Sequence, residues 1–197
     1  MAYKLNCNRR FSMNGKHKAS RLEDRGIELE RRVYERRSRY LIIFLTLNYK
    51  PEYREDMTID DLRRHRNRLF RNVECNELLG GINAYIWKIE EGATSGLHIH
   101  LLIFYSGNHR ADIHIAQRIG EYWERVSTRG LGAYWSSNGE KDRLIARGLD
   151  VGVGRIDRND TKGREAIRTI IRYLAQPGQE TDDLPWHGRT FGTSRLD

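Results

Sequence analysis

Apolar and polar residues alternate with two different periods in the first part of the chain. Residues 21–40 carry sparse apolar positions among many charges, which predicts a helix with a narrow buried stripe. Residues 41–48 are rich in β-branched and aromatic side chains and too few for a typical helix, so they predict a buried strand. Thr58 precedes two aspartates and predicts the N-cap of a second helix, whose apolar face includes Leu62 and Leu69.

Strands and helices continue to follow one another along the rest of the chain. Residues 83–91 and 97–105 predict two strands, and the five residues between them, which begin and end with glycine, predict a hairpin loop. We then predict a helix, a strand that contains glycines and a last helix that ends before Pro177, over residues 113–123, 149–156 and 164–176. Residues 128–138 and the tail from residue 180 predict irregular structure.

The order of these elements defines the expected fold class. After an N-terminal helix, the predicted order is β-α-β-β-α-β-α. We therefore expect an α+β fold with a single central antiparallel sheet and with helices packed on one face of it. Residues 1–39 are expected to form a basic N-terminal arm and helix, and residues 40–197 the main domain.

Length and composition restrict the class of protein further. The chain has 197 residues, which suits one compact domain. Its longest apolar run, residues 41–47, is too short to cross a bilayer, so we expect no membrane partner. The first ten residues lack the apolar core of a signal peptide, and Cys7 and Cys75 are too few for a disulfide framework. We expect a reduced protein in the cytoplasm.

Positive charge indicates a phosphate-rich partner. The chain has 35 Lys and Arg against 27 Asp and Glu, a formal net charge of +8. The second predicted helix concentrates this charge, and its run of arginines is consistent either with a solvated helix face or with contacts to backbone phosphate. Our hypothesis assigns the phosphate contacts to Arg63, Arg64 and Arg66.

The predicted hairpin carries the candidate chemistry. His98 and His100 share one face of their strand, because alternate side chains of a strand point the same way. If the hairpin closes over residues 92–96, Glu90 lies opposite His98 and Lys88 lies opposite His100. One carboxylate and two imidazoles suit Mn²⁺, Mg²⁺, Zn²⁺ or Fe²⁺. The alternative is a pair of polar strand positions whose hydrogen bonds are satisfied within the protein.

A candidate nucleophile lies on the last predicted helix. Tyr173 flanks the apolar stripe of that helix, and a phenol can attack phosphorus when a metal neutralises the phosphate oxygens. Arg168 and Arg172 form an i, i+4 pair suited to phosphate contacts. Two alternatives remain at this point: Tyr173 is an aromatic at the margin of the core, or Tyr122 is the nucleophile.

The chain resembles the His-hydrophobe-His (HUH) endonucleases, which include rolling-circle replication initiators and relaxases. Residues 44–47, Phe-Leu-Thr-Leu, resemble their first motif, and Glu90, His98 and His100 resemble the second. Tyr173 matches the third motif, Tyr-x-x-Lys, although Gln176 replaces its lysine. The similarity is greatest to the inovirus-type replication proteins, through residues 85–90, 96–104, 115–123, 172–177 and 189–194.

This resemblance implies an activity. In that family an RRM-like core binds Mn²⁺ or Mg²⁺, here through the Glu90 cluster, and the tyrosine nicks and joins single-stranded DNA. The products are a 5′-phosphotyrosine and a free 3′-hydroxyl that primes replication of a phage, satellite or plasmid. Gln176 is neutral, so Arg168 or Arg172 would have to supply the charge of the missing lysine. We expect the DNA contacts to include Arg63, Arg64, Arg66, Lys88, Arg168, Arg172 and Gln176.

The expected partners follow from the same resemblance. They are single-stranded DNA or an origin hairpin, together with host or phage replication proteins in a bacterial cytoplasm. The chain lacks the Gly-x-x-x-x-Gly-Lys-Ser/Thr loop of an ATPase, so strand unwinding is assigned to a separate helicase. The alternative function is a non-catalytic module that binds single-stranded nucleic acid on the same fold. The oligomeric state stays open.

Overall fold

The computed structural model describes residues 13–73, 75–146, 151–176 and 189–196. The helices are α1 (Met13–Arg36), α2 (Ile59–Arg71), α3 (Asp112–Tyr122), α4 (Lys141–Ala146) and α5 (Thr161–Ala175). The strands are β1 (Arg39–Tyr49), β2 (Ile82–Gly92), β3 (Gly96–Ser106), β4 (Gly132–Ser136), β5 (Gly154–Asp157) and β6 (Phe191–Thr193). Within these ranges, no helix combines the length and the apolar composition that crossing a membrane requires.

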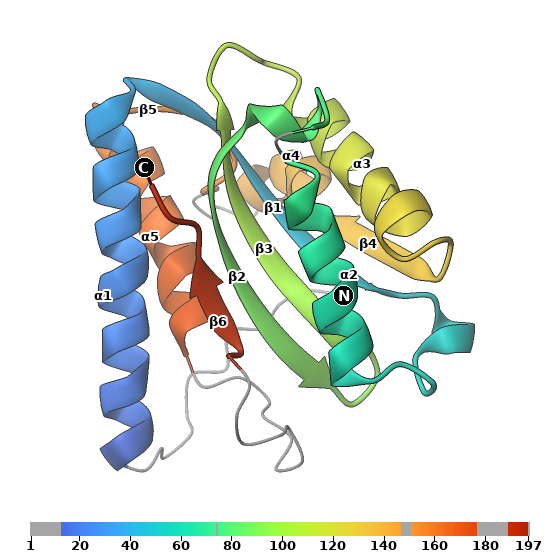
Figure 1. Ribbon diagram of the computed structural model, residues 1–197. Coiled ribbons are helices and arrows are strands. Elements are labelled where there is room, and N and C mark those ends of the chain that lie inside the picture. Colours follow the sequence, from blue (N-terminus) through green and yellow to red (C-terminus); the bar gives the residue numbers. More distant parts are fainter. Residues whose placement is uncertain (1–12, 74, 147–150, 177–188, 197) are drawn as a thin grey trace.

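All six strands belong to one antiparallel sheet, which confirms the α+β class (Figure 1). The strand order is β4-β1-β3-β2-β6, and β5 also pairs with β1. β4 and β5 share the outer edge of β1: β4 pairs with its second half and β5 with its first. The long strands β1, β3 and β2 therefore form the centre of the sheet.

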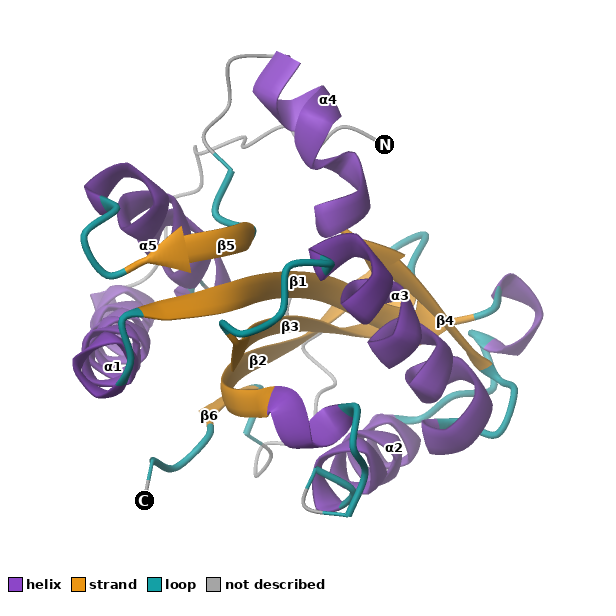
Figure 2. Cartoon of the chain, turned by 90° about the horizontal axis from the view of Figure 1, so that it is seen from above, coloured by secondary structure: helices purple, strands orange, loops and turns teal. Residues whose placement is uncertain are grey.

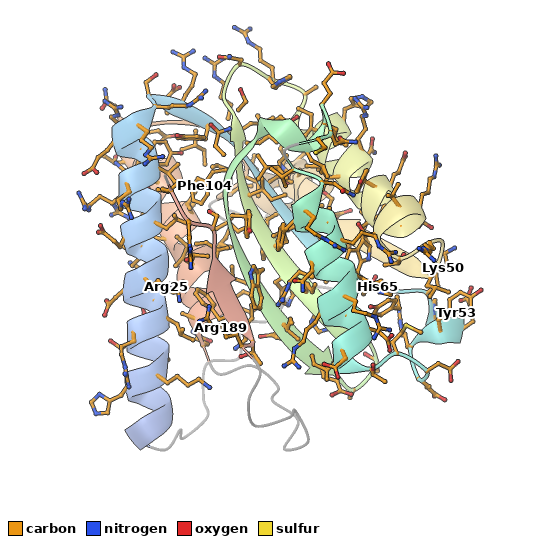
Figure 3. All side chains as sticks on the ribbon, viewed as in Figure 1. Arg25, Lys50, Tyr53, His65, Phe104 and Arg189 are labelled. Carbon is orange, nitrogen blue, oxygen red and sulfur yellow. The ribbon has the colours of Figure 1, made fainter. Side chains whose placement is uncertain are left out.

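Helices cover both faces of the sheet, and the expectation that they pack on one face was wrong. Figure 2 shows α1 and α5 grouped on one side and α2 and α3 on the other. Phe104 packs with α1 and α5, whereas Leu101 and Ile103 pack with α2 and α3. The labelled Phe104 and His65 of α2 illustrate the two sides in Figure 3. Nine of the eleven residues of β3 are buried, and a strand that is apolar on both faces needs cover on both.

Short strands at the sheet edges were not predicted. Residues 128–138 contain β4, and the tail contains β6, because these segments pair with the edges of β1 and β2. The predicted strand over residues 149–156 is shorter and later, as β5, and residues 147–150 lie outside the described residues. The N-terminal helix begins at Met13, earlier than expected.

A side chain fills the gap between β4 and β5 on the edge of β1. Asn138 accepts a hydrogen bond from the backbone N–H of Phe44 (3.1 Å) and donates one to the carbonyl of Ile42 (2.9 Å). Asp112 accepts a further hydrogen bond from the Asn138 amide (3.0 Å). Asn138 thus satisfies backbone groups that would otherwise be buried without partners, and it holds β1 in place near Phe44.

The N-terminal helix α1 packs directly on α5. Glu30 of α1 is fully buried and accepts hydrogen bonds from Arg164 (2.7 and 3.0 Å) and from Arg168 (3.4 Å). Gly26 lies where the helices cross, and a Cβ atom built there would lie 2.5 Å from Cγ2 of Ile171. The close approach of the two helices therefore depends on the absence of a side chain at Gly26.

This contact predicts a loss of stability on substitution of Gly26. Gly26→Val forces α1 away from Ile171 and should lower the free energy of unfolding by about 1–3 kcal/mol, measured by urea denaturation. Gly139→Val is the matched control, because a Cβ atom at this exposed glycine meets nothing within 4 Å. Equal losses in the two variants would contradict the close packing of α1 against α5.

Candidate metal centre

The β2–β3 hairpin has the register that the sequence predicts. Glu90 pairs with His98 and Lys88 pairs with His100, while Gly92 and Gly96 close the hairpin. Gly96 has a φ of 62°, a left-handed conformation that glycine adopts without strain. The turn therefore fixes which residues of the two strands lie opposite one another.

Glu90, His98 and His100 converge on one point. Nε2 of His100 lies 3.2 Å from Oε2 of Glu90, and Nε2 of His98 lies 3.8 Å from the same oxygen. One ligand atom from each residue lies within 4.8 Å of the others, and no other group of three such side chains occurs in the described ranges. His109 and His114, which a zinc site could have included, are therefore not part of a cluster there.

Hydrogen bonds orient both imidazole rings toward this point. Nδ1 of His98 lies 2.9 Å from the carbonyl oxygen of Gly96, and because that oxygen can only accept, Nδ1 carries the proton. The lone pair of Nε2 then faces the Glu90 carboxylate. Nδ1 of His100 lies 3.1 Å from Oγ1 of Thr46, which can hold this ring in the same tautomer. Such partners on the far nitrogen are typical of metal-bound histidines.

Electrostatics also favour a bound cation. Burial raises the pKa of Glu90, but hydrogen bonds from His100 and His98 outweigh this effect and hold the pKa well below its usual value. Burial lowers the pKa of His100, although Glu90 opposes this effect, so the ring stays neutral near pH 7. A carboxylate that faces neutral ring nitrogens carries net negative charge. This donor set fits a divalent cation, and Glu90, His98 and His100 form a candidate metal-binding cluster.

Tyr173 lies beside this cluster. It belongs to the last turn of α5, and its hydroxyl oxygen lies 3.3 Å from Nε2 of His100. The phenol and imidazole rings meet edge to face, with centroids 5.5 Å apart. Tyr122, the alternative nucleophile, is on α3 across the sheet, where its hydroxyl accepts a hydrogen bond from Asn72. Of the two tyrosines, the fold brings Tyr173 to the cluster.

Phe44 and Thr46 of β1 complete the surroundings of His100, and sequence analysis missed both roles. The Phe44 ring stacks on the His100 ring with centroids 6.0 Å apart, and Thr46 pairs directly with His100 across the strands. Alternation along β1 could have placed the two side chains on one face. The pairing of β1 with β3 could not be derived from local sequence, since 54 residues separate Thr46 from His100.

Lys88 is a buried cation near the same cluster. It is 2% exposed, and its Nζ donates a hydrogen bond to the backbone carbonyl of Gln176, 3.3 Å away. The ammonium group also contributes to holding the pKa of Glu90 low. The side chain of Gln176 is exposed. Lys88 therefore links β2 to the end of α5, close to Tyr173 in the chain.

The arginines of α5 contact α1. Arg168 forms an ion pair with Glu30 (3.4 Å), and Arg172 forms ion pairs with Glu23 (3.3 Å) and Glu165 (2.7 Å). The ion pairs with Glu30 and Glu23 stabilise the α1–α5 contact. The expected role of both arginines in DNA binding stays a prediction.

The arginines of α2 lie across the sheet from the metal cluster. Arg63 forms an ion pair with Asp60 (3.1 Å) and Arg64 with Asp61, whereas Arg66 lies over the Trp87 ring. Their assignment to DNA binding also stays a prediction. If they bind DNA, they do so on the face opposite Tyr173.

Comparison with known proteins gives one match. The family model described as a replication-associated protein of the ORF2 type matches residues 42–177. This range runs from β1 to just beyond α5, so it includes the three residues of the cluster and Tyr173. Searches of curated proteins and of solved structures returned no significant match.

The geometry predicts that Glu90 is required for metal binding. Glu90→Ala removes the anionic ligand and should abolish Mn²⁺ binding measured by isothermal titration calorimetry. Glu91→Ala is the matched control, because Glu91 pairs with Leu97 and points to the other face of the hairpin. Mn²⁺ binding of unchanged affinity in Glu90→Ala would contradict the site.

Proposed function

Because this chain belongs to the ORF2-type family of replication-associated proteins, we propose that it initiates rolling-circle replication by nicking and rejoining single-stranded DNA. Tyr173 is the nucleophile in this proposal. The observation that carries it is the position of the Tyr173 hydroxyl, 3.3 Å from a ring nitrogen of the candidate metal cluster. The replicated element is a phage, satellite or plasmid genome in a bacterial cytoplasm, and the family resemblance is of the HUH, inovirus type.

Glu90, His98 and His100 hold Mn²⁺ or Mg²⁺ in this proposal, since both ions accept carboxylate oxygen and imidazole nitrogen. When bound, the cation neutralises charge on the non-bridging oxygens of the scissile phosphate. The protein's own contribution is orientation. Gly96 and Thr46 hold the histidine rings, and the hairpin register holds Glu90 opposite them.

The proposed step exchanges one phosphate ester for another. The Tyr173 oxygen forms a bond to phosphorus, and the bond from phosphorus to the 3′-oxygen of the DNA breaks. The phenol loses its proton and the departing 3′-oxygen gains one, so the step balances without a co-reactant. The ester on Tyr173 retains the 5′-phosphate, and attack by a 3′-hydroxyl reverses the step and rejoins the strand.

Lys88 supplies the cation that Gln176 lacks. The Lys88 ammonium is buried on the face of the cluster and donates to the backbone of Gln176 one residue beyond α5. Arg168 and Arg172, the substitutes expected from the sequence, have their guanidinium groups on glutamates of α1. A fixed positive charge at this position stabilises charge that develops on the phosphate in the transition state.

Tyr173→Phe tests the nucleophile. The variant should bind single-stranded DNA with unchanged affinity and form no covalent adduct, because only the attacking oxygen is lost. The assay detects a protease-sensitive protein–DNA band in a denaturing gel, with Mn²⁺ present and with the metal chelated. Tyr122→Phe is the matched control and should form the adduct normally.

Other results of this assay would contradict the proposal. An adduct that persists in Tyr173→Phe would assign the nucleophile to another residue. If the unmodified protein binds many origin sequences but forms no metal-dependent adduct with any of them, the chain is a non-catalytic binding module. Gln176 in place of the motif lysine is the feature that favours this second function.

Lys88→Gln tests the cation. The substitution removes the charge but keeps a hydrogen-bond donor for the Gln176 carbonyl, so adduct formation should slow by about 100-fold. A purely structural role would instead lower the unfolding midpoint and leave the rate of the folded fraction unchanged. Mn²⁺ binding by calorimetry serves as the control for an intact cluster. An unchanged rate of adduct formation would exclude Lys88 from the chemistry.

A further inference from the structure

A cavity of about 700 Å³ lies between α2 and β2, on the face of the sheet opposite the metal cluster. Tyr85 and Trp87 of β2 point into it, whereas Lys88 and Glu90 of the same strand point to the α5 side. The cavity is therefore separated from Tyr173 by the thickness of the sheet. Its lining residues are Arg64, Arg66, Asn67, Arg68, Phe70, Arg71, Tyr85 and Trp87.

The lining carries four arginines and no carboxylate. Arg66 is the most constrained of them: its guanidinium carbon lies 4.1 Å from the centroid of the Trp87 ring, and Asn67 accepts hydrogen bonds from it at 2.9 and 3.2 Å. Burial and the neighbouring charge of Arg63 lower the pKa of Arg66. A guanidinium that is partly removed from water among like charges gains from a bound anion.

Arg71 adds an accessible charge to the cavity. It is exposed, and it forms no hydrogen bond or ion pair with the residues that the structure describes. Arg64 and Arg68 are partly engaged, with Asp61 and with the carbonyl of Ser127. Each guanidinium has five N–H donors, so these arginines keep donors for a ligand.

The aromatic residues form the walls of the cavity. Phe70 and Tyr85 stack on each other with centroids 4.0 Å apart. The far side of the Trp87 ring contacts β6, where a Cβ atom at Gly192 would lie 2.5 Å from the ring. Both faces of Trp87 are thus covered, by Arg66 and by Gly192. The rings support the arginines rather than offer open faces for stacking bases, which favours a phosphate over a base as the ligand.

We propose that this cavity binds the phosphodiester backbone of DNA that flanks the nick, separately from the scissile phosphate. The proposal rests on the DNA-binding part of the proposed function and not on its chemistry. Guanidinium groups bind phosphate through paired hydrogen bonds, and Trp87 holds Arg66 in place for such contacts. A strand held at the metal cluster has to pass around the sheet to reach Arg66. The cavity therefore positions a second segment of the same DNA.

The test compares two double variants of equal charge. Arg66→Gln/Arg71→Gln removes charge from the cavity, and Arg125→Gln/Arg143→Gln removes the same charge from two well-exposed arginines outside it. The probe is a mixed-sequence oligonucleotide, either single-stranded or folded as a hairpin, long enough to reach both faces. Binding is measured by fluorescence anisotropy over a range of salt concentrations.

We expect the cavity variant to bind about tenfold more weakly and to show a smaller salt dependence. Two lost phosphate contacts lower the slope of log K against log salt by about 1.4 for single strands and about 1.8 for duplex DNA, so the slope identifies the bound form. The single variant Arg71→Gln, at an exposed position, should lower the slope by about half as much with an unchanged unfolding midpoint. Equal affinities and slopes for the two double variants would overturn the proposal.

The same variants separate this proposal from the proposed nicking activity. The cavity variant should keep its Mn²⁺ affinity and should form the covalent adduct normally on an oligonucleotide too short to reach the cavity. Weaker DNA binding by this variant, together with no adduct in any protein, would retain the cavity and reject the nickase. Normal adducts with equal binding by both double variants would retain the nickase and reject the cavity.

Discussion

The antiparallel register of β2 against β3 is the constraint on which the candidate site depends. Glu90, His98 and Lys88 all belong to this hairpin, and each would change faces if the pairing slipped by one residue. The left-handed backbone at Gly96 terminates the pairing at a defined place. Its carbonyl also accepts the hydrogen bond that orients His98. One turn therefore fixes both the position of a ligand and its protonation.

The second requirement is the placement of α5 over that hairpin. Tyr173 reaches His100 only because the last turn of α5 ends above β2 and β3, where Lys88 donates to the carbonyl of Gln176. α1 holds α5 from the other side through the buried carboxylate of Glu30. α1 precedes the residues that the family model matches, yet it supports the helix that carries the candidate nucleophile.

The sheet separates two sites of opposite charge preference. On the α5 face, an ionised carboxylate and two imidazoles provide a site for a cation. On the α2 face, four arginines with aromatic support provide a site for anions. A replication-associated protein has to hold DNA on both sides of the bond it changes. Two faces of one sheet can hold two DNA segments at a fixed separation, because the packed core between them does not deform continuously.

Local sequence was sufficient for the features that depend on backbone periodicity. Alternation along β3 placed His98 and His100 on one face, and the glycine-bounded turn predicted that Glu90 would lie opposite His98. The period of the last helix placed Tyr173 beside its apolar stripe, where the structure has it half-buried. These features follow from the chain's immediate neighbours, and the central strands and helices were predicted for the same reason.

Only the tertiary structure decided which distant segments meet. β4 and β6 exist because β1 and β2 offer free edges, and Thr46 holds the ring of His100 only because β1 lies beside β3. Glu30 binds Arg164 across 134 residues, a contact that decides how α1 and α5 pack. Such contacts depend on packing that covers both faces of the sheet at once, and no local period of the chain encodes that choice.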